Sequence, residues 1–271
     1  TQIYLSRYFL GGFFISKIGL NKRTKSDKIS MQTKKKGEYD IETYHITKMR
    51  IRYKKWARPE LEASKFYIDE PEKMKGKWKK FFKNPNNPLH IELGCGKGQF
   101  IAKMASKHTE NNYIAIDLVD AMLGLAKRNI EKEYQEAKKE PENVIITRFD
   151  IERIPLILDE KDQIKRIYIN FCNPWPKGKH HKKRLTHTRQ LEKYKTFLSS
   201  DGEIFFKTDD DDLYLASLRY FEESEFEIIS KTEDLHKNQI FPENIVTEHE
   251  NMFTEQGITT KAIIAKLKSE K

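Results

Sequence analysis

The sequence contains only two cysteines, Cys95 and Cys172, in 271 residues. Two cysteines cannot build a disulfide framework, and no Cys-x-x-Cys pair stands at zinc spacing from a downstream His or Cys. These absences exclude a disulfide-rich secreted domain and a structural zinc module. They favour a reducing compartment, so we expect free thiols and a cytoplasmic location.

Long hydrophobic runs are also missing. The most apolar stretch near the N-terminus, residues 8–20, is interrupted by Lys17. It is far shorter than the roughly 20 residues that a membrane span needs, and no small-x-small cleavage site follows it. We therefore predict neither an anchor nor a signal peptide. The 37% of hydrophobic residues is still enough for a substantial core, which excludes general disorder.

Charge is abundant and unevenly distributed. The chain has 51 Lys and Arg against 41 Asp and Glu, a net charge of +10. Residues 1–48 hold ten of the basic residues and four acids, a net charge of +6. We interpret residues 1–48 as a poorly structured basic extension. Regular patterning covers residues 49–271, which we predict to form one domain with a basic lead-in over residues 49–88.

From residue 89 onwards, short apolar runs alternate with segments of helical periodicity. Strands are predicted at 89–93, 113–118, 144–149, 166–171 and 203–208, with two more around 226–229 and 259–267. Between them, apolar residues recur three or four positions apart, for example at Met122, Ala126 and Ile130. This alternation predicts an α/β fold, a mostly parallel twisted sheet of about seven strands with helices on both faces.

The first long predicted strand runs into a glycine-rich turn formed by Gly94, Gly96 and Gly98. Glycine lets the backbone turn tightly and approach a ligand where a Cβ would clash. Ligands of open α/β sheets bind outside the carboxyl ends of the strands. The spacing G-x-G-x-G is one residue shorter than the dinucleotide fingerprint, which counts against a nicotinamide oxidoreductase.

Three acids stand at the ends of successive predicted strands: Glu92, Asp117 and Asp150. A carboxylate at the end of the second strand is where a ribose hydroxyl pair is held. Glu92 would repel a pyrophosphate but attract the ammonium of a methionine moiety. The predicted cofactor is therefore S-adenosylmethionine (SAM), although each acid taken singly is explained equally well as a solvated loop residue.

The loop after the predicted strand 166–171 carries Pro-Trp-Pro and then a basic stretch. Two prolines around Trp175 make a stiff loop suited to presenting a platform for a planar base. Apart from Gly178, the next eight residues are all basic or His: Lys177, Lys179, His180, His181, Lys182, Lys183 and Arg184. This composition favours an electrostatic surface for phosphates over the alternative of a solvated helix start. No metal is predicted, because the two histidines lack a third ligand and the lysines would repel a cation.

Four segments, in this order, resemble the bacterial tRNA (guanine-N7-)-methyltransferases: IELGCGKGQF, NFCNPWPKGKHHKKRLTH, FFKTDD and TEHENMFTEQG. The resemblance covers about residues 49–271. It implies a Rossmann-like class I methyltransferase fold, SAM as cofactor, and a guanine in the variable loop of tRNA as substrate. Asn173 stands where many members have an Asp treated as catalytic, and Asp117 where many have Glu.

The resemblance also implies roles for particular residues. The implied cofactor contacts are Glu92, Asp117, Asp150 and Asn173. The implied substrate contacts are Lys177, Asp209, Thr247, Glu248, His249 and Glu250. The implied RNA-binding stretch is Lys179 to Arg184.

N7 of neutral guanine carries a lone pair and no proton, so its methylation needs alignment and charge accommodation but no general base. Asp209 or Glu250 could accept hydrogen bonds from guanine N1–H and its amino group. Two alternatives stay open. One is a SAM-dependent enzyme acting on another RNA or a small molecule, and the other is a non-catalytic RNA-binding protein on the same scaffold. The sequence leaves open whether the protein is a monomer or a homodimer.

Overall fold

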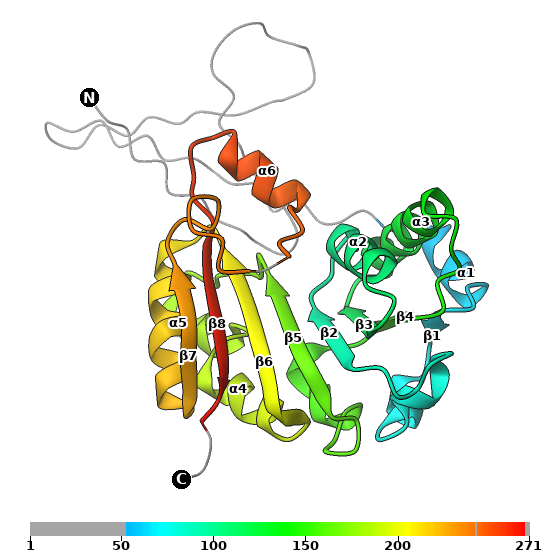
Figure 1. The fold of residues 1–271 in the computed structure, drawn as a ribbon, viewed down its shortest axis with the longest axis horizontal. Coiled ribbons are helices and arrows are strands. Elements are labelled where there is room, and N and C mark those ends of the chain that lie inside the picture. The colour runs from blue at the N-terminus through cyan, green and yellow to red at the C-terminus, as the bar shows by residue number, and fades with distance from the viewer. Residues whose placement is uncertain (1–52, 242, 269–271) are drawn as a thin grey trace, which may run out of the picture. The chain divides into compact units, whose positions relative to one another are not determined.

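The computed structural model describes residues 53–241 and 243–268, and the predicted extension over residues 1–48 lies outside them. Within the described residues the strands form one eight-stranded sheet in the order β1-β4-β3-β2-β5-β6-β8-β7 (Figure 1). The strands are β1 Tyr67–Ile68, β2 Leu89–Leu93, β3 Asn112–Asp117, β4 Val144–Arg148, β5 Ile164–Asn170, β6 Leu198–Thr208, β7 Phe226–Thr232 and β8 Lys261–Leu267.

The prediction of a mostly parallel sheet is confirmed. Strands β1 to β6 pair in parallel, and β8 is antiparallel to both β6 and β7. The predicted number of about seven strands is corrected to eight by β1, which pairs with β4 through Tyr67 and Ile146. Two residues are too short for alternation to be recognised in the sequence, and only the contact with β4 makes them a strand.

Helices cover both faces of the sheet, as predicted. The α-helices are α1 Ala57–Glu62, α2 Gln99–Lys107, α3 Asp120–Glu136, α4 Thr188–Lys195, α5 Asp211–Glu223 and α6 Glu248–Thr254. The short 3-10 helices are η1 Pro71–Met74, η2 Trp78–Phe81, η3 Ile151–Leu156 and η4 Gly178–Lys183. Helices α1, α2 and α3 pack on one face, and α4 and α5 on the other.

Strand alternation supplies a core to each face. In β3, Ile114 and Ile116 belong to the same hydrophobic cluster as residues of α4 and α5, whereas Tyr113 and Ala115 belong to the cluster that contains residues of α1 to α3. Because successive side chains of a strand point to opposite faces, a sheet covered on both sides needs apolar residues at every position. This requirement explains the continuous apolar runs from which the strands were predicted.

The topology defines one edge of the sheet as the place for a site. Strand β2 lies between β3 and β5, so the chain order reverses there, and the loops that follow these strands diverge from one another.

Cys95 follows β2 and Cys172 follows β5, and both are free thiols. None of the described helices combines the length and apolar character that a bilayer crossing would require.

Candidate active site

The glycine turn after β2 contains three glycines with two different functions. All three have positive φ, 78° at Gly94, 53° at Gly96 and 68° at Gly98. At Gly98 an added Cβ would lie 2.5 Å from the Cβ of Ala126 in α3, so packing between α2 and α3 requires glycine there. At Gly94 and Gly96 an added Cβ would meet no atom within 4 Å. The turn therefore faces open space that a ligand can occupy.

Glu92 is the most unusual acid at this edge. Its side chain is 2% exposed, and its Oε1 accepts a hydrogen bond of 3.0 Å from Asn170 Nδ2. Its Oε2 is buried without a hydrogen-bond partner. Burial raises the pKa of Glu92 to about 8, although its hydrogen bond with Asn170 and the nearby Lys207 oppose the shift. A buried acceptor that lacks a partner suits a ligand that brings its own donor.

Asp117 and Asp150 lie at the same edge of the sheet. Asp117 accepts hydrogen bonds from the backbone N–H of Gly96 (3.0 Å) and of Val119 (2.9 Å), so it holds the glycine turn in place. Burial raises its pKa. Asp150 accepts from the N–H of Glu152 at 3.0 Å and caps η3. Both carboxylates are thus oriented by backbone donors at the strand ends.

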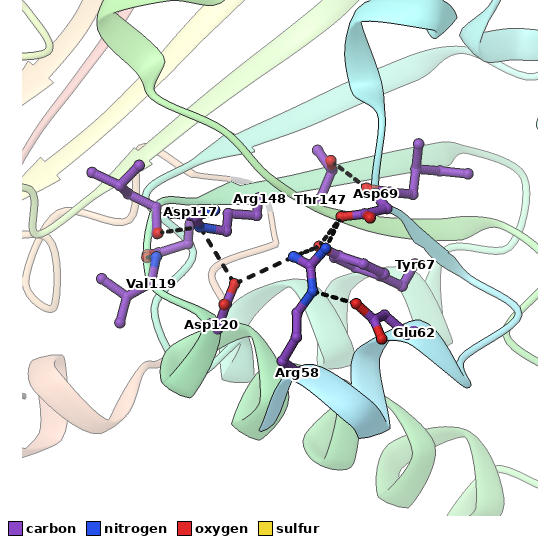
Figure 2. A network of polar contacts seen from close by, with 11 residues as sticks. Arg58, Glu62, Tyr67, Asp69, Asp117, Val119, Asp120, Thr147 and Arg148 are labelled. Atoms are coloured by element: carbon purple, nitrogen blue, oxygen red, sulfur yellow. Dashed lines mark hydrogen bonds and ion pairs between the residues drawn. The ribbon is translucent and has the colours of Figure 1, made fainter. Parts of the chain in front are cut away.

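A polar network holds the backbone beside Asp117 (Figure 2). Arg58 of α1 hydrogen-bonds to Asp69 and lies 3.9 Å from Asp120 at the start of α3. Arg148 at the end of β4 lies 3.4 Å from the same Asp120. One carboxylate thus links α1, α3 and β4, which restrains the segment that follows Asp117.

The loop after β5 is held in an unusual backbone conformation. Phe171 and Trp175 have φ of 51° and 45°, a region that costs energy for residues with a Cβ. Between them, Asn173 Oδ1 accepts a hydrogen bond of 3.0 Å from the N–H of Trp175. Arg184 Nε donates to the carbonyl of Pro174 at 2.7 Å. The middle of the loop, at Pro174 and Trp175, is therefore fixed by two side chains.

Arg184 differs from the rest of the predicted RNA-binding stretch. It is 2% exposed and faces the loop, so this conformation does not present it to RNA. Lys179, Lys182 and Lys183 of η4 are exposed, as is Lys177. The sequence stretch was predicted as one basic surface. In the structure it divides into an exposed basic face and one internal support.

The exposed basic face adjoins the half-buried Trp175. Lys183 Nζ lies 5.0 Å from the centre of the Trp175 ring, and the His180 ring lies 5.7 Å from it. Partial desolvation, together with Lys179 and the neighbouring lysines, lowers the pKa of His180. The positive charge of this face thus comes mainly from its lysines. His181 is half-buried in η4.

Residues Thr247 to Glu250 begin α6 and join two parts of the site. Thr247 caps the helix, since its Oγ1 accepts from the N–H of Glu250 at 3.1 Å. Glu248 pairs with Lys97 of the glycine turn at 2.9 Å. The His249 ring stacks on Phe171 with centroids 5.9 Å apart. Helix α6 thus lies over the carboxyl ends of the strands and contacts both the glycine turn and the loop after β5 (Figure 1).

Glu250 takes a position that the sequence did not indicate. It is fully buried, and its Oε2 lies 2.8 Å from Nζ of the fully buried Lys207 in β6. Its Oε1 accepts from Asn244 Nδ2 at 2.7 Å. Both oxygens are engaged inside the protein, which does not fit the prediction that Glu250 hydrogen-bonds to guanine. Asp209 is half-buried, and its carbonyl accepts from Lys261 Nζ at 3.1 Å.

Sequence reasoning missed Lys207 and Asn170. The signal for Lys207 was a lysine within the apolar strand segment 203–208, because a lysine is almost never fully buried without a counter-ion. No comparable signal marks Asn170.

Among the described residues, no three His, Cys, Asp or Glu side chains cluster as metal ligands would.

Comparison with known proteins identifies the family. A family model described as "Putative methyltransferase" matches residues 86–263. A protein of Clostridium beijerinckii named tRNA (guanine-N(7)-)-methyltransferase is 57% identical over 217 residues, which are 80% of this chain and 98% of that protein. A protein of the same name from Acetivibrio thermocellus is 50% identical over 220 residues, which are 81% of this chain and 100% of that protein.

Structural comparison agrees on the fold. The solved structure of the 16S rRNA methyltransferase KamB has a TM-score of 0.50 and is 10% identical, over 70% of this chain and 90% of that chain. At this identity the likeness concerns the fold alone. With the family match and the curated relatives, it confirms the Rossmann-like class I methyltransferase fold, and this chain belongs to the tRNA (guanine-N7-)-methyltransferase family.

Proposed function

We propose that this protein transfers a methyl group from SAM to N7 of a guanine in the variable loop of tRNA. The observation that carries the proposal is Glu92, a buried carboxylate with one unpartnered oxygen beside an open glycine turn. A basic loop around Trp175 lies at the same edge of the sheet. Relatives at 50 to 58% identity named for this activity support the same reaction.

The residues at the edge fit SAM. Glu92 would hold the ammonium of its methionine part, because that ammonium supplies the donor that Oε2 lacks. Asp117 would hold the ribose, and Asp150 lies at the end of the next strand. Gly94 and Gly96 leave room for the ligand beside the backbone. When bound, SAM supplies a methyl group on a positively charged sulfur.

The protein's own residues have to hold the guanine in line with that methyl group. N7 brings a lone pair and no proton, so no side chain needs to act as a base. We assign the orientation of the reacting groups to Asn173, whose loop is fixed by the bonds to Trp175 N–H and Pro174 C=O. We assign recognition of the guanine N1–H and amino edge to the Asp209 carboxylate. Carboxylates nearby also favour the positive charge that develops on the base.

The exposed lysines of η4 are proposed to bind tRNA phosphates. Lys177, Lys179, Lys182 and Lys183 are exposed and adjoin Trp175, so phosphate contacts and base stacking are possible at one surface. Because tRNA is the substrate, the proposed location is the cytoplasm.

The test is methyl transfer from labelled SAM to an unmodified tRNA transcript, followed by mapping of the labelled nucleotide. We expect one methyl group per tRNA, on N7 of a variable-loop guanine. A transcript with adenine at that position serves as the control and should stay unlabelled. Transfer to a ribosomal RNA fragment but not to tRNA would favour the other-RNA alternative, and SAM binding without transfer to any RNA would favour a non-catalytic protein.

A further inference from the structure

Lys207 is a fully buried lysine in β6, an interior strand of the sheet. It lies near the end of β6, two residues after Phe205, and strand alternation directs both side chains to the same face. Burying an ammonium carries a large desolvation penalty, and an apolar side chain at this position would avoid it. Its hydrogen-bond partners all lie in residues 244–250, which suggests that the charge holds this segment in place.

The three N–H bonds of the Lys207 ammonium have three acceptors in one short segment. They are Glu250 Oε2 at 2.8 Å, Asn244 Oδ1 at 3.0 Å and the carbonyl of Ile245 at 3.2 Å. A lysine ammonium has three donors, so this set uses its full capacity. Asn244 also donates to the other oxygen of Glu250, which closes the cluster. Residues 244–250 are thus bound to β6 through a single side chain.

The ammonium also lies where three parts of the candidate site meet. Its Nζ is 5.6 Å from the ring of Phe100 in the first turn of α2, 5.9 Å from Phe171 of the loop after β5, and 6.0 Å from Phe241. Phe100 follows the glycine turn and Phe171 precedes Asn173. A shift of Lys207 would therefore disturb the cofactor side and the reaction side of the site together.

The segment held by Lys207 also has apolar contacts, since Ile245 is buried in the core and Phe253 of α6 lies against Phe171. Helix α6 has seven residues, and helices shorter than about 12 residues are marginal in isolation. Its outer ion pair, Lys97 with Glu248, is half-exposed and therefore weak. The Lys207 cluster is the buried polar attachment, and it joins the first turn of the helix, which carries His249, to β6.

We infer that Lys207 is a positioning residue for tRNA recognition, which acts through Glu250 to set the orientation of residues 244–250 over the site. This inference rests on the proposed function and adds a residue to it. Glu250 is then part of the support of the recognition segment, and the contacts to guanine fall to its neighbours and to Asp209.

The decisive variant is the double substitution Lys207→Met with Glu250→Met. Replacing both members of a buried ion pair by apolar side chains leaves no unpaired charge, so the melting temperature should stay close to that of the wild type. If Lys207 positions the segment, KM for tRNA rises at least tenfold in this stable protein. If the pair only stabilises the fold, KM returns to the wild-type value together with stability, which would overturn the inference.

A second variant covers the case in which the double variant folds poorly. Glu250→Gln keeps the size of the side chain but leaves the buried Lys207 ammonium without its counter-ion, so a lower melting temperature is expected. An affinity for SAM within about threefold of the wild type shows that the domain is folded in the assay, while KM for tRNA rises. Lys266→Met is the matched control. Lys266 lies on the neighbouring strand β8, 3.5 Å from Glu227, and its loss should change neither quantity.

Hydrogen exchange separates this inference from the proposed function, because it requires no tRNA. The amides of Glu250 and Asn251, which bond to Thr247, should exchange at least tenfold faster in the double variant, with β6 and β8 unchanged. If the wild-type protein methylates no tRNA, the proposed function is wrong, but the exchange measurement still tests the positioning role. If these amides exchange at the same rate in the wild type and in the double variant, Lys207 does not position the segment.

Discussion

At the scale of single residues, we predict that Glu92 makes the free energy of unfolding depend on pH. Its pKa in the folded protein is about 8, against the ordinary value of 4.5, because burial disfavours the carboxylate. Between these values the folded protein holds a proton that the unfolded chain has lost. Without SAM, this contribution to the free energy of unfolding is fully present below pH 4.5 and is lost as the pH rises to about 8.

We predict that SAM affinity shows the opposite trend. The ammonium of SAM needs the ionised carboxylate, so affinity rises by up to about tenfold per pH unit until the pH reaches the pKa of Glu92 and then levels off. Calorimetry in two buffers of different ionisation enthalpy should detect release of up to one proton per SAM bound. Glu92→Gln is the control. It should bind SAM weakly with a flat pH profile, and a retained slope would place the titrating group elsewhere.

Substitutions at Asn173 test whether the reaction needs a negative charge at this position. Asp at this position can accept the same hydrogen bond from Trp175 N–H that the amide accepts at 3.0 Å. Asn173→Asp should therefore change the single-turnover rate by less than about tenfold, or roughly 1.4 kcal/mol. Asn173→Ala should cost more because it removes the orienting group. A rate increase with Asp far beyond tenfold would instead indicate that a carboxylate is needed for charge stabilisation.

At the scale of elements, we predict that the lysines of η4 bind RNA and that Arg184, which follows η4, supports the loop. Replacing Lys179, Lys182 and Lys183 by Ala should weaken tRNA binding and lower the salt slope of log K by about 0.7 to 0.9 for each phosphate that the variant no longer neutralises. Arg184→Ala is the contrasting variant. Its guanidinium is buried against Pro174 C=O, so it should lower stability and turnover and leave the salt slope unchanged. Equal slopes in the triple variant and the wild type would make the lysines an ordinary solvated surface.

The contact between the glycine turn and α6 is a second prediction at this scale. Lys97 and Glu248 are half-exposed, so their ion pair contributes at most about 1 kcal/mol. Lys97→Ala should raise KM for tRNA by about fivefold or less, and 1 M salt should remove most of the difference. The exchanged pair Lys97→Glu with Glu248→Lys should restore the wild-type KM at low salt. If the exchanged pair does not restore the wild-type KM, the change in KM comes from the loss of Lys97 itself and not from the loss of the ion pair.

At the scale of the whole molecule, residues 1–48 should be dispensable for the reaction. A relative named for this reaction is matched over 98% of its length by 217 residues of this chain, so we expect a domain of that size to be enough here. Deletion of residues 1–48 should leave the melting temperature and turnover nearly unchanged. Their net charge of +6 should add only weak, salt-sensitive RNA affinity. A large loss of turnover at saturating tRNA would make the extension part of the working enzyme.

Sequence patterns were sufficient to predict seven of the eight strands, the helical periodicity of α3 and the edge of the sheet at which Glu92, Asp117 and Asp150 lie. These follow from local rules. Apolar periodicity identifies each element, and parallel strands place all their carboxyl ends at one edge. The two-residue strand β1 escaped these rules because pairing with β4 alone creates it.

The folded structure was needed to establish which charged side chains face the solvent and which face the interior. Arg184 belongs to a basic run and points inward, and Glu250 belongs to an acidic helix start and is buried. The direction of each side chain depends on a partner elsewhere in the chain: Arg184 bonds to Pro174, and Glu250 pairs with Lys207, 43 residues away. A buried charge is stable only where such a partner offsets its desolvation. Sequence spacing does not encode that proximity, and the packed sheet creates it.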